Sequence, residues 1–238
     1  MRLIAALAIA ALLLAGCEPG QPRVPDDQDK AGPFPAADRP VAHIISSRWS
    51  TEEARDRLNE ASEVMNKAGL KAGMTVADIG AGEGYYTIRL ASRVGKDGRV
   101  LAEDIVAGVR DALAERVARE RLDNVSVRLG LPANPRLPEA SFDRILMVHM
   151  YHEIEQPYEF LWRMRPSLRP DGLVVVVDAN RPTQNHGTPP ALLKCEFAAI
   201  GYAQVEMHDM PSAGGYLATF RAVGPRPDPA AIKPCRIG

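Results

Sequence analysis

A glycine-rich turn between an apolar stretch and a helix is the feature of this sequence that most restricts its fold. The turn is Gly80-Ala81-Gly82-Glu83-Gly84; it follows the apolar residues 75–79 and precedes residues 85–94, which have helical spacing. Glycine lacks a Cβ atom, so the backbone can turn tightly and a ligand can lie against bare peptide. The following helix directs its free N–H groups into the same crevice. The sequence therefore predicts a strand–turn–helix unit that binds a nucleotide-like ligand.

Strands and helices continue to alternate along the chain. Further strands are predicted at residues 99–105, 125–129, 142–148, 173–177, 203–208 and 216–223, and further helices at 52–68, 109–121, 157–168 and 190–200. This alternation predicts right-handed βαβ units and a mostly parallel, doubly wound sheet. The short turn before the last strand predicts that this strand is antiparallel. We therefore expect a single α/β domain of Rossmann-like type.

The residues around the turn narrow the choice of ligand. A dinucleotide fingerprint, G-x-G-x-x-G, would place its third glycine at position 85, where this chain has Tyr85. A bulky side chain there opposes close seating of a pyrophosphate, and Asp78 and Glu83 would repel phosphate. S-adenosylmethionine has no phosphate and carries cationic groups. The turn therefore favours S-adenosylmethionine over a dinucleotide, and a nicotinamide oxidoreductase is disfavoured.

Two acids end the second predicted strand. Glu103 and Asp104 would lie at the carboxyl edge of the sheet, beside the glycine turn. A carboxylate there can accept hydrogen bonds from both ribose hydroxyls. We favour Asp104 for this role, with Glu103 as the competitor; the alternative is that the acid caps the next helix.

In combination, these segments resemble the class I S-adenosylmethionine-dependent methyltransferases. The resemblance runs from about Trp49 to Val223 and rests on Val76–Gly84, Glu103-Asp104, residues 142–146 and the segment Leu168-Arg169-Pro170-Asp171-Gly172-Leu173. It implies a seven-stranded sheet with a reversed last strand and S-adenosyl-L-methionine as the cofactor. The positions it implies for cofactor contact are Asp78, Gly80, Ala81, Gly82, Gly84, Glu103, Asp104, Leu131 and His149.

The chain departs from the family after the third strand. The family places an acid or polar residue near the adenine, and this chain has Gly130-Leu131-Pro132. Leu131 could cover the face of the adenine, whose amino group would then need a backbone acceptor.

The loop after the fourth strand contains the candidate catalytic residues. It reads His149-Met150-Tyr151-His152-Glu153 and lies at the carboxyl end of a central strand. His152 or Glu153 could act as a general base on an acceptor, and Tyr151 could hydrogen-bond substrate. The alternative is that the loop only lines the cofactor site and caps the next helix. His149 and His152 lack the H-E-x-x-H order and a clear third ligand, so we expect no metal site.

Further residues could complete the acceptor pocket. Arg181, after the fifth strand, could pair with an acidic substrate or lie in solvent. Trp49, Tyr85 and Tyr86 could form the walls of this pocket, although isolated aromatic residues more often serve packing.

The N-terminus predicts export. Arg2 precedes an apolar run at residues 3–14 that is too short to span a bilayer but suits a signal peptide. The run ends in Leu14-Ala15-Gly16-Cys17, which resembles the lipobox of bacterial lipoproteins; a plain secretory peptide or a misassigned start are the alternatives. We expect a signal peptide at residues 1–16, a flexible tether at 17–40, the methyltransferase-like domain at 41–224 and a C-terminal tail at 225–238.

The resemblance to lipoproteins implies a location. Lipid on Cys17 would anchor the chain in the cell envelope, facing the periplasm, and Glu18 in place of aspartate slightly favours the outer membrane. Cys195 and Cys235 then remain as an even pair in an oxidising compartment. We hypothesise a disulfide between them; two unpaired cysteines are the alternative.

Charge limits the partners. The 29 basic residues nearly balance the 30 acidic residues, so no overall field attracts nucleic acid, and a small-molecule acceptor is expected. The oligomeric state cannot be read from the sequence. The predicted reaction is in-line attack of the acceptor on the sulfonium methyl group, which depends mostly on positioning. Because S-adenosylmethionine is a cytosolic metabolite, a non-catalytic nucleoside-binding module of the same fold remains the alternative for an exported chain.

Overall fold

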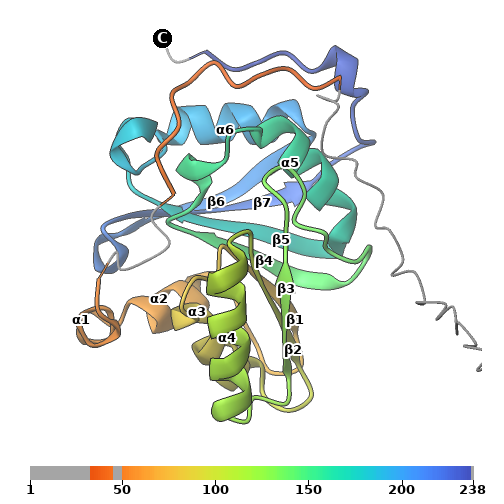
Figure 1. Ribbon diagram of the computed structural model, residues 1–238. Coiled ribbons are helices and arrows are strands. Elements are labelled where there is room, and N and C mark those ends of the chain that lie inside the picture. The colour runs from red at the N-terminus through yellow and green to blue at the C-terminus, as the bar shows by residue number, and fades with distance from the viewer. Residues whose placement is uncertain (1–32, 45–49, 237–238) are drawn as a thin grey trace, which may run out of the picture. The chain divides into compact units, whose positions relative to one another are not determined.

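The structure is a computed structural model that describes residues 33–44 and 50–236. Its seven strands form one sheet in the order β3-β2-β1-β4-β5-β7-β6 (Figure 1). The strands are β1 (Thr75–Ile79), β2 (Arg99–Asp104), β3 (Val125–Leu129), β4 (Phe142–Val148), β5 (Leu168–Asp178), β6 (Tyr202–Met210) and β7 (Gly215–Ala222). Strands β1 to β5 pair in parallel, whereas β7 runs antiparallel to both β5 and β6. The predicted α/β fold, with seven strands and a reversed last strand, is confirmed.

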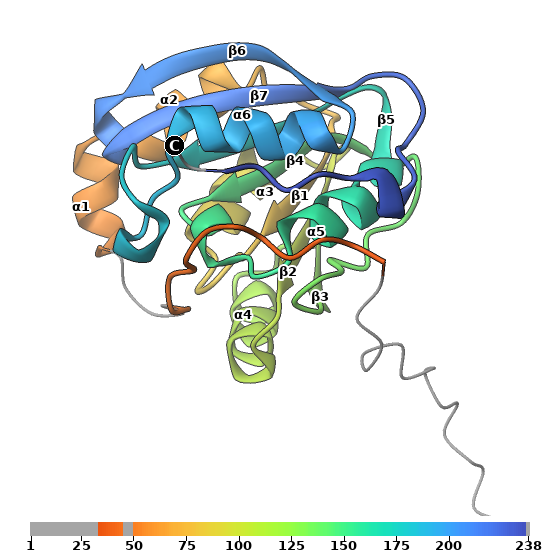
Figure 2. The same cartoon turned by 90° about the horizontal axis from the view of Figure 1, so that it is seen from above.

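Helices cover both faces of the sheet (Figure 2). They are α1 (Glu52–Arg57), α2 (Glu60–Lys67), α3 (Tyr85–Val94), α4 (Ala107–Arg119), α5 (Pro157–Met164) and α6 (Pro190–Ala199). Val174 and Val176 of β5 pack in one core cluster with residues of α5 and α6. The intervening Val175 and Val177 pack in the other cluster, with residues of α2 and α3. Because successive strand residues point to opposite faces, a continuous valine run matches a strand that is buried on both sides.

The helix predicted over residues 52–68 is interrupted. It divides into α1 and α2 at Leu58 and Asn59, and Asn59 has a left-handed backbone with φ 56°. Asparagine tolerates this conformation better than most residues, and it ends one helix while the next begins. The prediction of one continuous helix is therefore wrong. Ala61, Val64 and Met65 of its expected apolar face are buried, but Leu58, expected on the same face, lies at the break and is 59% exposed.

The boundary between α5 and β5 also differs from the prediction. Helix α5 ends at Met164, and residues 165–167 form a single 3₁₀ turn. Pro166 cannot donate an amide hydrogen bond, so it opposes continuation of the helix to residue 168. The strand predicted at residues 173–177 also begins earlier, because residues 168–172 form the first part of β5.

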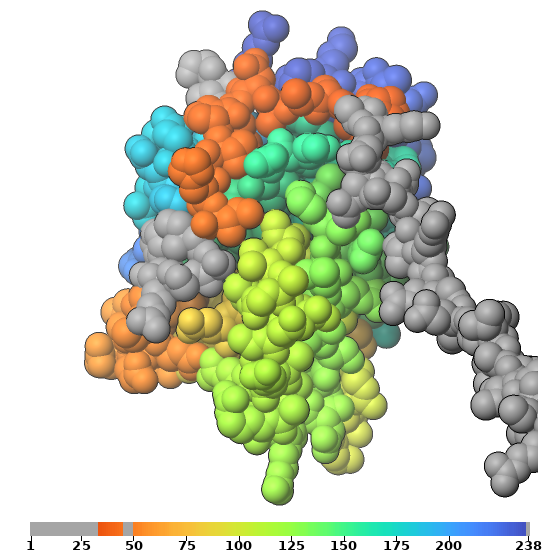
Figure 3. Space-filling model, in the orientation of Figure 1, coloured from red at the N-terminus to blue at the C-terminus, as the bar shows by residue number. Residues whose placement is uncertain are grey.

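Both ends of the described chain pack against the domain. Residues 33–44, orange-red in Figure 3, lie along the surface beside α5 and α6. Arg39 is buried there: its Nε lies 2.8 Å from a carboxylate oxygen of Glu196 in α6. At the other end, Cys235 is joined by a disulfide to Cys195 of α6. The hypothesis of this disulfide is confirmed in the structure.

Some expectations fall on other parts of the chain. The predicted signal peptide, Cys17 and Trp49 lie outside the described residues. Among the helices that are described, none has both the length and the apolar character needed to cross a bilayer.

Candidate functional site

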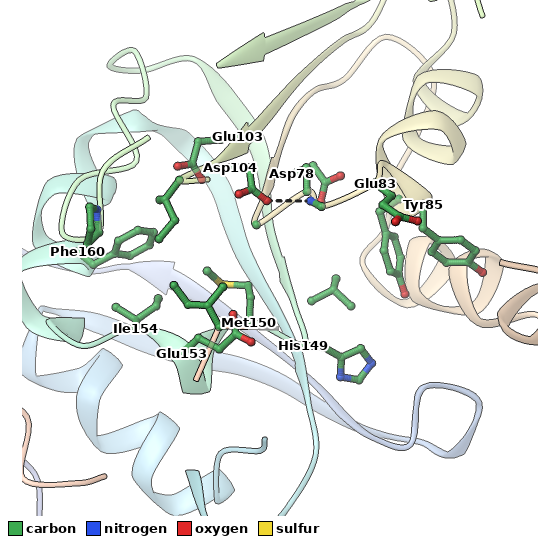
Figure 4. A pocket seen from close by; sticks show the side chains of 18 of the residues that line it. Asp78, Glu83, Tyr85, Glu103, Asp104, His149, Met150, Glu153, Ile154 and Phe160 are labelled. Atoms are coloured by element: carbon green, nitrogen blue, oxygen red, sulfur yellow. Dashed lines mark hydrogen bonds between the residues drawn. The ribbon is translucent and has the colours of Figure 1, made fainter. Parts of the chain in front are cut away.

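A cavity of about 260 Å³ opens at the carboxyl ends of β1, β2 and β4 (Figure 4). It combines the glycine turn, the acids that end β1 and β2, the loop after β4, and residues of α1 and α5. The predicted site residues that line it are Asp78, Gly80, Ala81, Gly82, Glu103, Asp104, His149 and Glu153. The tertiary structure therefore brings most of the predicted residues together around one space.

The glycine turn has the backbone that its sequence predicts. Gly80, Gly82 and Gly84 have φ values of 66°, 55° and 91°, in the region that glycine adopts most easily. A Cβ atom at Gly84 would lie 2.5 Å from the side chain of Leu113 in α4, so packing also excludes a larger residue at this position. A Cβ atom at Gly82 would meet nothing within 4 Å. Gly84 therefore supports the turn, whereas Gly82 borders the open cavity.

Asp78 lies beneath the turn and is almost completely buried. Its carboxylate accepts a hydrogen bond of 2.6 Å from the hydroxyl of Thr87 in α3. Burial raises the pKa of Asp78 to about 6, against the hydrogen bond from Thr87, which lowers it. This acid therefore both holds α3 onto β1 and contributes to the wall of the cavity.

Asp104 binds two backbone N–H groups. One oxygen accepts from the amide of Gly82 at 3.0 Å, shown as the dashed line in Figure 4, and the other accepts from Val106 at 2.9 Å. Val106 is the N-cap residue of α4. The carboxylate therefore joins the glycine turn to the start of α4. Val106 makes no side-chain cap hydrogen bond, and Asp104 binds the amide of this N-cap residue rather than an amide inside α4; Asp104 also lines the cavity.

Glu103 has a different environment. Its side chain is buried, and Oε1 has no hydrogen-bond partner among the residues that the structure describes. Burial, with a smaller contribution from Asp104, raises the pKa of Glu103 to about 8. A Cβ atom at Gly130 would lie only 1.4 Å from this Oε1. The glycine after β3 therefore leaves the space that the Glu103 carboxyl group occupies.

Tyr85 forms part of the wall next to α1. The guanidinium groups of Arg55 and Arg89 each lie 3.8 Å from the centre of its ring, and its hydroxyl donates to Asp56 at 3.0 Å. Arg89 also pairs with Asp56 and with Glu52. Tyr85 occupies the position where a dinucleotide-binding turn would have its third glycine, and here it anchors α1 beside the cavity. Glu52 and Arg55 of α1 line this cavity.

The loop after β4 separates the three candidate catalytic residues. Glu153 lines the cavity, but Tyr151 and His152 are not among its lining residues. Tyr151 is fully buried and donates to Glu196 at 2.7 Å. His152 is also buried, and its Nδ1 lies 3.0 and 3.1 Å from the two carboxylate oxygens of Asp178. Only Glu153 of the three is placed to approach a molecule in the cavity.

His149 lines the same cavity in an uncommon conformation. Its φ is 55°, and its ring nitrogens are buried. Burial lowers the pKa of His149 to about 4, so the imidazole is neutral near pH 7. A neutral ring adds no positive charge to the site, which suits a cationic ligand.

Other predicted residues lie elsewhere. Leu131 pairs with Asn134 in a short bridge and does not line the cavity, whereas the next residue, Pro132, does. The lining residues that the sequence did not indicate are Ile44, Ser50, Glu52, Arg55, Ile105, Pro132, Val148, Met150, Ile154, Glu155 and Phe160. Ile105 could have been expected from its position after Asp104. Phe160 lies on a helix whose apolar pattern does not distinguish cavity from core.

Comparison with known proteins supports this picture over part of the chain. Residues 76–172 match the family model described as "Methyltransferase domain". A nocamycin O-methyltransferase of Saccharothrix syringae is 40% identical over 31% of this chain and 26% of its own length. A ubiquinone/menaquinone biosynthesis C-methyltransferase of Hahella chejuensis is 30% identical over 50% of this chain and 48% of its own length. The matches thus span less than half of each of these two relatives.

Solved structures with the same fold cover more of the chain. An S-adenosylmethionine-dependent methyltransferase from Aquifex aeolicus has a TM-score of 0.61 at 23% identity, covering 72% of this chain and 97% of its own. The [4+2]-cyclase SpnF also has a TM-score of 0.61, at 16% identity, covering 81% and 89%. The described chain therefore has the fold of the S-adenosylmethionine-dependent methyltransferases, and its residues 76–172 match their domain in sequence.

Proposed function

We propose that this protein is an S-adenosylmethionine-dependent methyltransferase that acts on a small-molecule acceptor. The observation that carries the proposal is the cavity at the carboxyl ends of β1 and β2, where the open Gly82 backbone lies beside Asp78, Glu103 and Asp104. The carboxyl groups of Asp78 and Asp104 beside bare peptide suit a cationic ligand without phosphate, and the Glu103 carboxyl group adds a hydrogen-bonding position. The domain match over residues 76–172 supports the same function.

The residues present fit this cofactor. Glu103 offers a buried oxygen without a partner among the described residues, and a ribose hydroxyl could supply the missing hydrogen bond. Asp104 holds the glycine turn in place and keeps lone pairs for a second hydroxyl. We assign Ile105, Pro132 and Phe160, which are apolar lining residues, to the adenine. This assignment replaces Leu131 with its neighbour Pro132.

Positioning is the main contribution of the protein to the reaction. When bound, S-adenosylmethionine supplies an activated methyl group and a good neutral leaving group. The glycine turn orients the ligand, and α1 together with Tyr85 covers one side of the cavity. Glu153 lines the cavity and could remove a proton from an acceptor. Few other catalytic side chains are required for such a transfer.

The proposal does not assign the atom of the acceptor that receives the methyl group. One of the two relatives is named an O-methyltransferase and the other a C-methyltransferase. The near-neutral charge of the chain favours a small molecule over nucleic acid.

Binding and turnover can be separated by experiment. Calorimetry on the purified protein with S-adenosylhomocysteine should show saturable binding to one site. Mass spectrometry of a panel of small hydroxyl, amine and acidic-carbon acceptors with S-adenosylmethionine should then reveal a mass increase of one methyl group. The absence of binding to either molecule would refute the proposal.

A non-catalytic nucleoside-binding module is the second candidate. It is favoured by the predicted export and by the neighbour named a [4+2]-cyclase, whose presence among similar folds means that fold alone does not determine the reaction. Tight binding without turnover of any acceptor would favour this candidate.

We also propose that lipid on Cys17 anchors the chain in the cell envelope, facing the periplasm. The Cys195–Cys235 disulfide supports an oxidising compartment. Metabolic labelling with palmitate, followed by fractionation, should place the wild-type chain in the membrane and Cys17→Ser in the soluble fraction. An unlabelled wild-type chain in the cytoplasm would contradict the anchor.

A further inference from the structure

Two histidines and a glutamate, residue types that can ligate metals, converge at the edge of the loop that follows β4. His152 and Glu153 belong to the 3₁₀ turn Tyr151–Glu153, and His186 is the C-cap of the 3₁₀ turn Thr183–Asn185. One nitrogen of each histidine and one carboxylate oxygen of Glu153 lie within 4.8 Å of one another. The centres of the two imidazole rings are 5.4 Å apart, and the ring planes are nearly perpendicular. Two segments more than 30 residues apart thus present three donors to one point.

A buried carboxylate fixes the first of these ligands. Asp178, at the end of β5, is fully buried and lies 3.0 Å from Nδ1 of His152. It also accepts hydrogen bonds from the amide of Ala179 and the hydroxyl of Thr188, so it cannot turn away. When a carboxylate holds one nitrogen of a histidine, the ring is oriented and the other nitrogen is left for a ligand. Here the nitrogen left is Nε2 of His152.

The loop that carries His186 is also held in place. Its amide donates to Thr183 at 3.1 Å, and the amide of Thr188 donates to Ala179 at 2.9 Å, which closes the loop. Thr183 in turn donates its hydroxyl to Pro40 of the N-terminal segment at 2.6 Å. His186 itself has a left-handed backbone, with φ 56°. A non-glycine residue in this conformation indicates that the surrounding structure determines where its side chain lies.

The chemistry of the cluster can be compared with that of a general base. A base needs a single oriented imidazole, which Asp178 and His152 would already supply. A second imidazole and a carboxylate at the same point add nothing to that role, but two nitrogens and one oxygen form a common ligand set for zinc. The carboxylates of Glu153 and Asp178 also contribute negative charge near the point, opposed by Arg181 close to His186. The convergence of donors therefore favours a cation.

We propose that His152, Glu153 and His186 bind one divalent transition-metal ion, with Zn²⁺ as the best match, and that Asp178 orients His152. Ligands at about 2.0–2.2 Å from a tetrahedral zinc ion lie about 3.5 Å apart, so donor atoms within 4.8 Å of one another need to move inward by at most roughly 1 Å. Glu153 and His186 are only half-buried, whereas His152 is buried. Three protein ligands leave a fourth position for water or an oxygen of a small molecule, and Glu153 places this site at the wall of the cavity. The proposal does not depend on methyl transfer.

Calorimetry with zinc sulfate on the full chain, stripped of metal with a chelator, tests the proposal directly. The Cys17→Ser background gives a chain without the proposed lipid and without a thiol outside the Cys195–Cys235 disulfide that could compete for the ion. One saturable equivalent is expected. Substitution of Co²⁺ should give the visible absorption of a site with nitrogen and oxygen ligands, a signature that a purely structural histidine would not produce.

Variants identify the ligands. His186→Gln and Glu153→Gln should each weaken zinc binding more than tenfold, and Asp178→Asn about 10- to 100-fold through loss of orientation. His208→Gln is the matched control, because His208 lies 3.1 Å from Glu206 without a third donor in the cluster; it should leave binding unchanged. His186 lies in a loop, and circular dichroism would show whether its variant remains folded.

Two results would overturn the proposal: no saturable zinc binding by the wild-type chain, or binding that His186→Gln leaves unaffected. Zinc binding that persists in a chain with no affinity for S-adenosylhomocysteine would support the metal site and refute the proposed methyltransferase function separately.

Discussion

At the scale of single residues, Glu103 and Asp104 are adjacent in the sequence but have different surroundings. Both oxygens of Asp104 accept backbone hydrogen bonds, whereas Oε1 of Glu103 has no partner in the described part of the chain. The sequence favoured Asp104 as the ribose ligand, with Glu103 as the competitor. Its partners show that Asp104 joins the glycine turn to the start of α4, and both acids line the cavity.

Asp104→Ala should reduce the affinity for S-adenosylhomocysteine about 10- to 100-fold. The substitution removes a charged acceptor, and hydrogen bonds to charged groups contribute roughly 1.5–3 kcal/mol each. It also releases the amide of Gly82 from its 3.0 Å hydrogen bond. Calorimetry measures the change, and Asp111→Ala on the exposed side of α4 is the control. Equal affinities of wild type and Asp104→Ala would contradict the assignment.

Glu103→Gln should change the pH dependence of stability. The pKa of Glu103 is about 8 in the folded protein, above its ordinary value of 4.5, so the folded state retains this proton longer than the unfolded chain. Stability is therefore complete below about pH 4.5 and decreases as the pH rises toward 8. The amide cannot ionise, so the variant should exceed wild type by on the order of 3 kcal/mol at pH 8 and match it more closely at pH 5.

Urea unfolding at the two pH values measures this difference. Glu115→Gln, at an exposed position of α4, should show no comparable gain at pH 8. A Glu103→Gln variant whose advantage is the same at both pH values would show that the carboxyl group is ionised normally in the folded protein.

At the scale of elements, α1 is a short helix held beside the cavity mainly by charged groups. Glu52 pairs with Arg89 and Arg116, and Asp56 pairs with Arg89. No residue of α1 is fully buried, so few apolar contacts hold this helix. Its separation from α2 at Asn59 could not be predicted from periodicity, because the apolar spacing continues across the break.

Arg89→Ala should loosen α1 without unfolding the domain. Partly exposed ion pairs contribute at most about 1 kcal/mol each, so the loss of global stability should be small. Because Glu52 and Arg55 line the cavity, affinity for S-adenosylhomocysteine should decrease roughly 3- to 10-fold, a change of about 1 kcal/mol.

Hydrogen exchange should increase in residues 50–58 of this variant, and calorimetry should report the weaker binding. Lys96→Ala is the control, since Lys96 forms a fully exposed pair with Asp97 away from α1. If Arg89→Ala binds as tightly as wild type and protects residues 50–58 equally, the ion pairs do not position α1.

At the scale of the whole molecule, α6 connects the core to both ends of the described chain. Glu196 binds Arg39 of the N-terminal segment and Tyr151 of the loop after β4, and the adjacent Cys195 joins the C-terminal tail. Tyr158 accepts a hydrogen bond of 2.6 Å from the amide of Cys235. The described parts of the predicted tether and of the predicted tail therefore pack against the domain, although both segments have a low apolar content.

The disulfide should account for part of the global stability. Its two cysteines are 40 residues apart, and closing a loop of that length in the unfolded chain corresponds to about 4 kcal/mol in the chain-entropy model. The double substitution Cys195→Ser and Cys235→Ser should lower the free energy of unfolding by about 2–4 kcal/mol, measured in urea.

Reduction with dithiothreitol should destabilise the wild-type chain by a similar amount and leave the double variant unchanged. Alkylation of both thiols in the untreated, purified wild-type protein would show that the bridge is not formed.

Local sequence determined the order and type of most elements. The glycine turn, the two acids after β2 and the valine run of β5 each have a local cause: backbone freedom, strand ends, or burial on both faces. These features were sufficient for the α/β fold with its reversed last strand, and they indicated most of one wall of the cavity. The predicted element boundaries were wrong where Asn59 and Pro166 end a helix although the apolar pattern continues.

Only the tertiary structure decided which side chains meet across long separations. The loop at residues 149–153 shows this, because its sequence contains three candidate catalytic residues. Tyr151 binds Glu196 and His152 binds Asp178. Only Glu153 of the three lines the cavity. His186 reaches the same loop from beyond β5. A spacing pattern describes neighbours along one strand or helix, whereas contacts between loops depend on how the sheet and its helices pack. Sequence alone therefore predicted which loops surround the cavity, and the packing determined which of their residues line it.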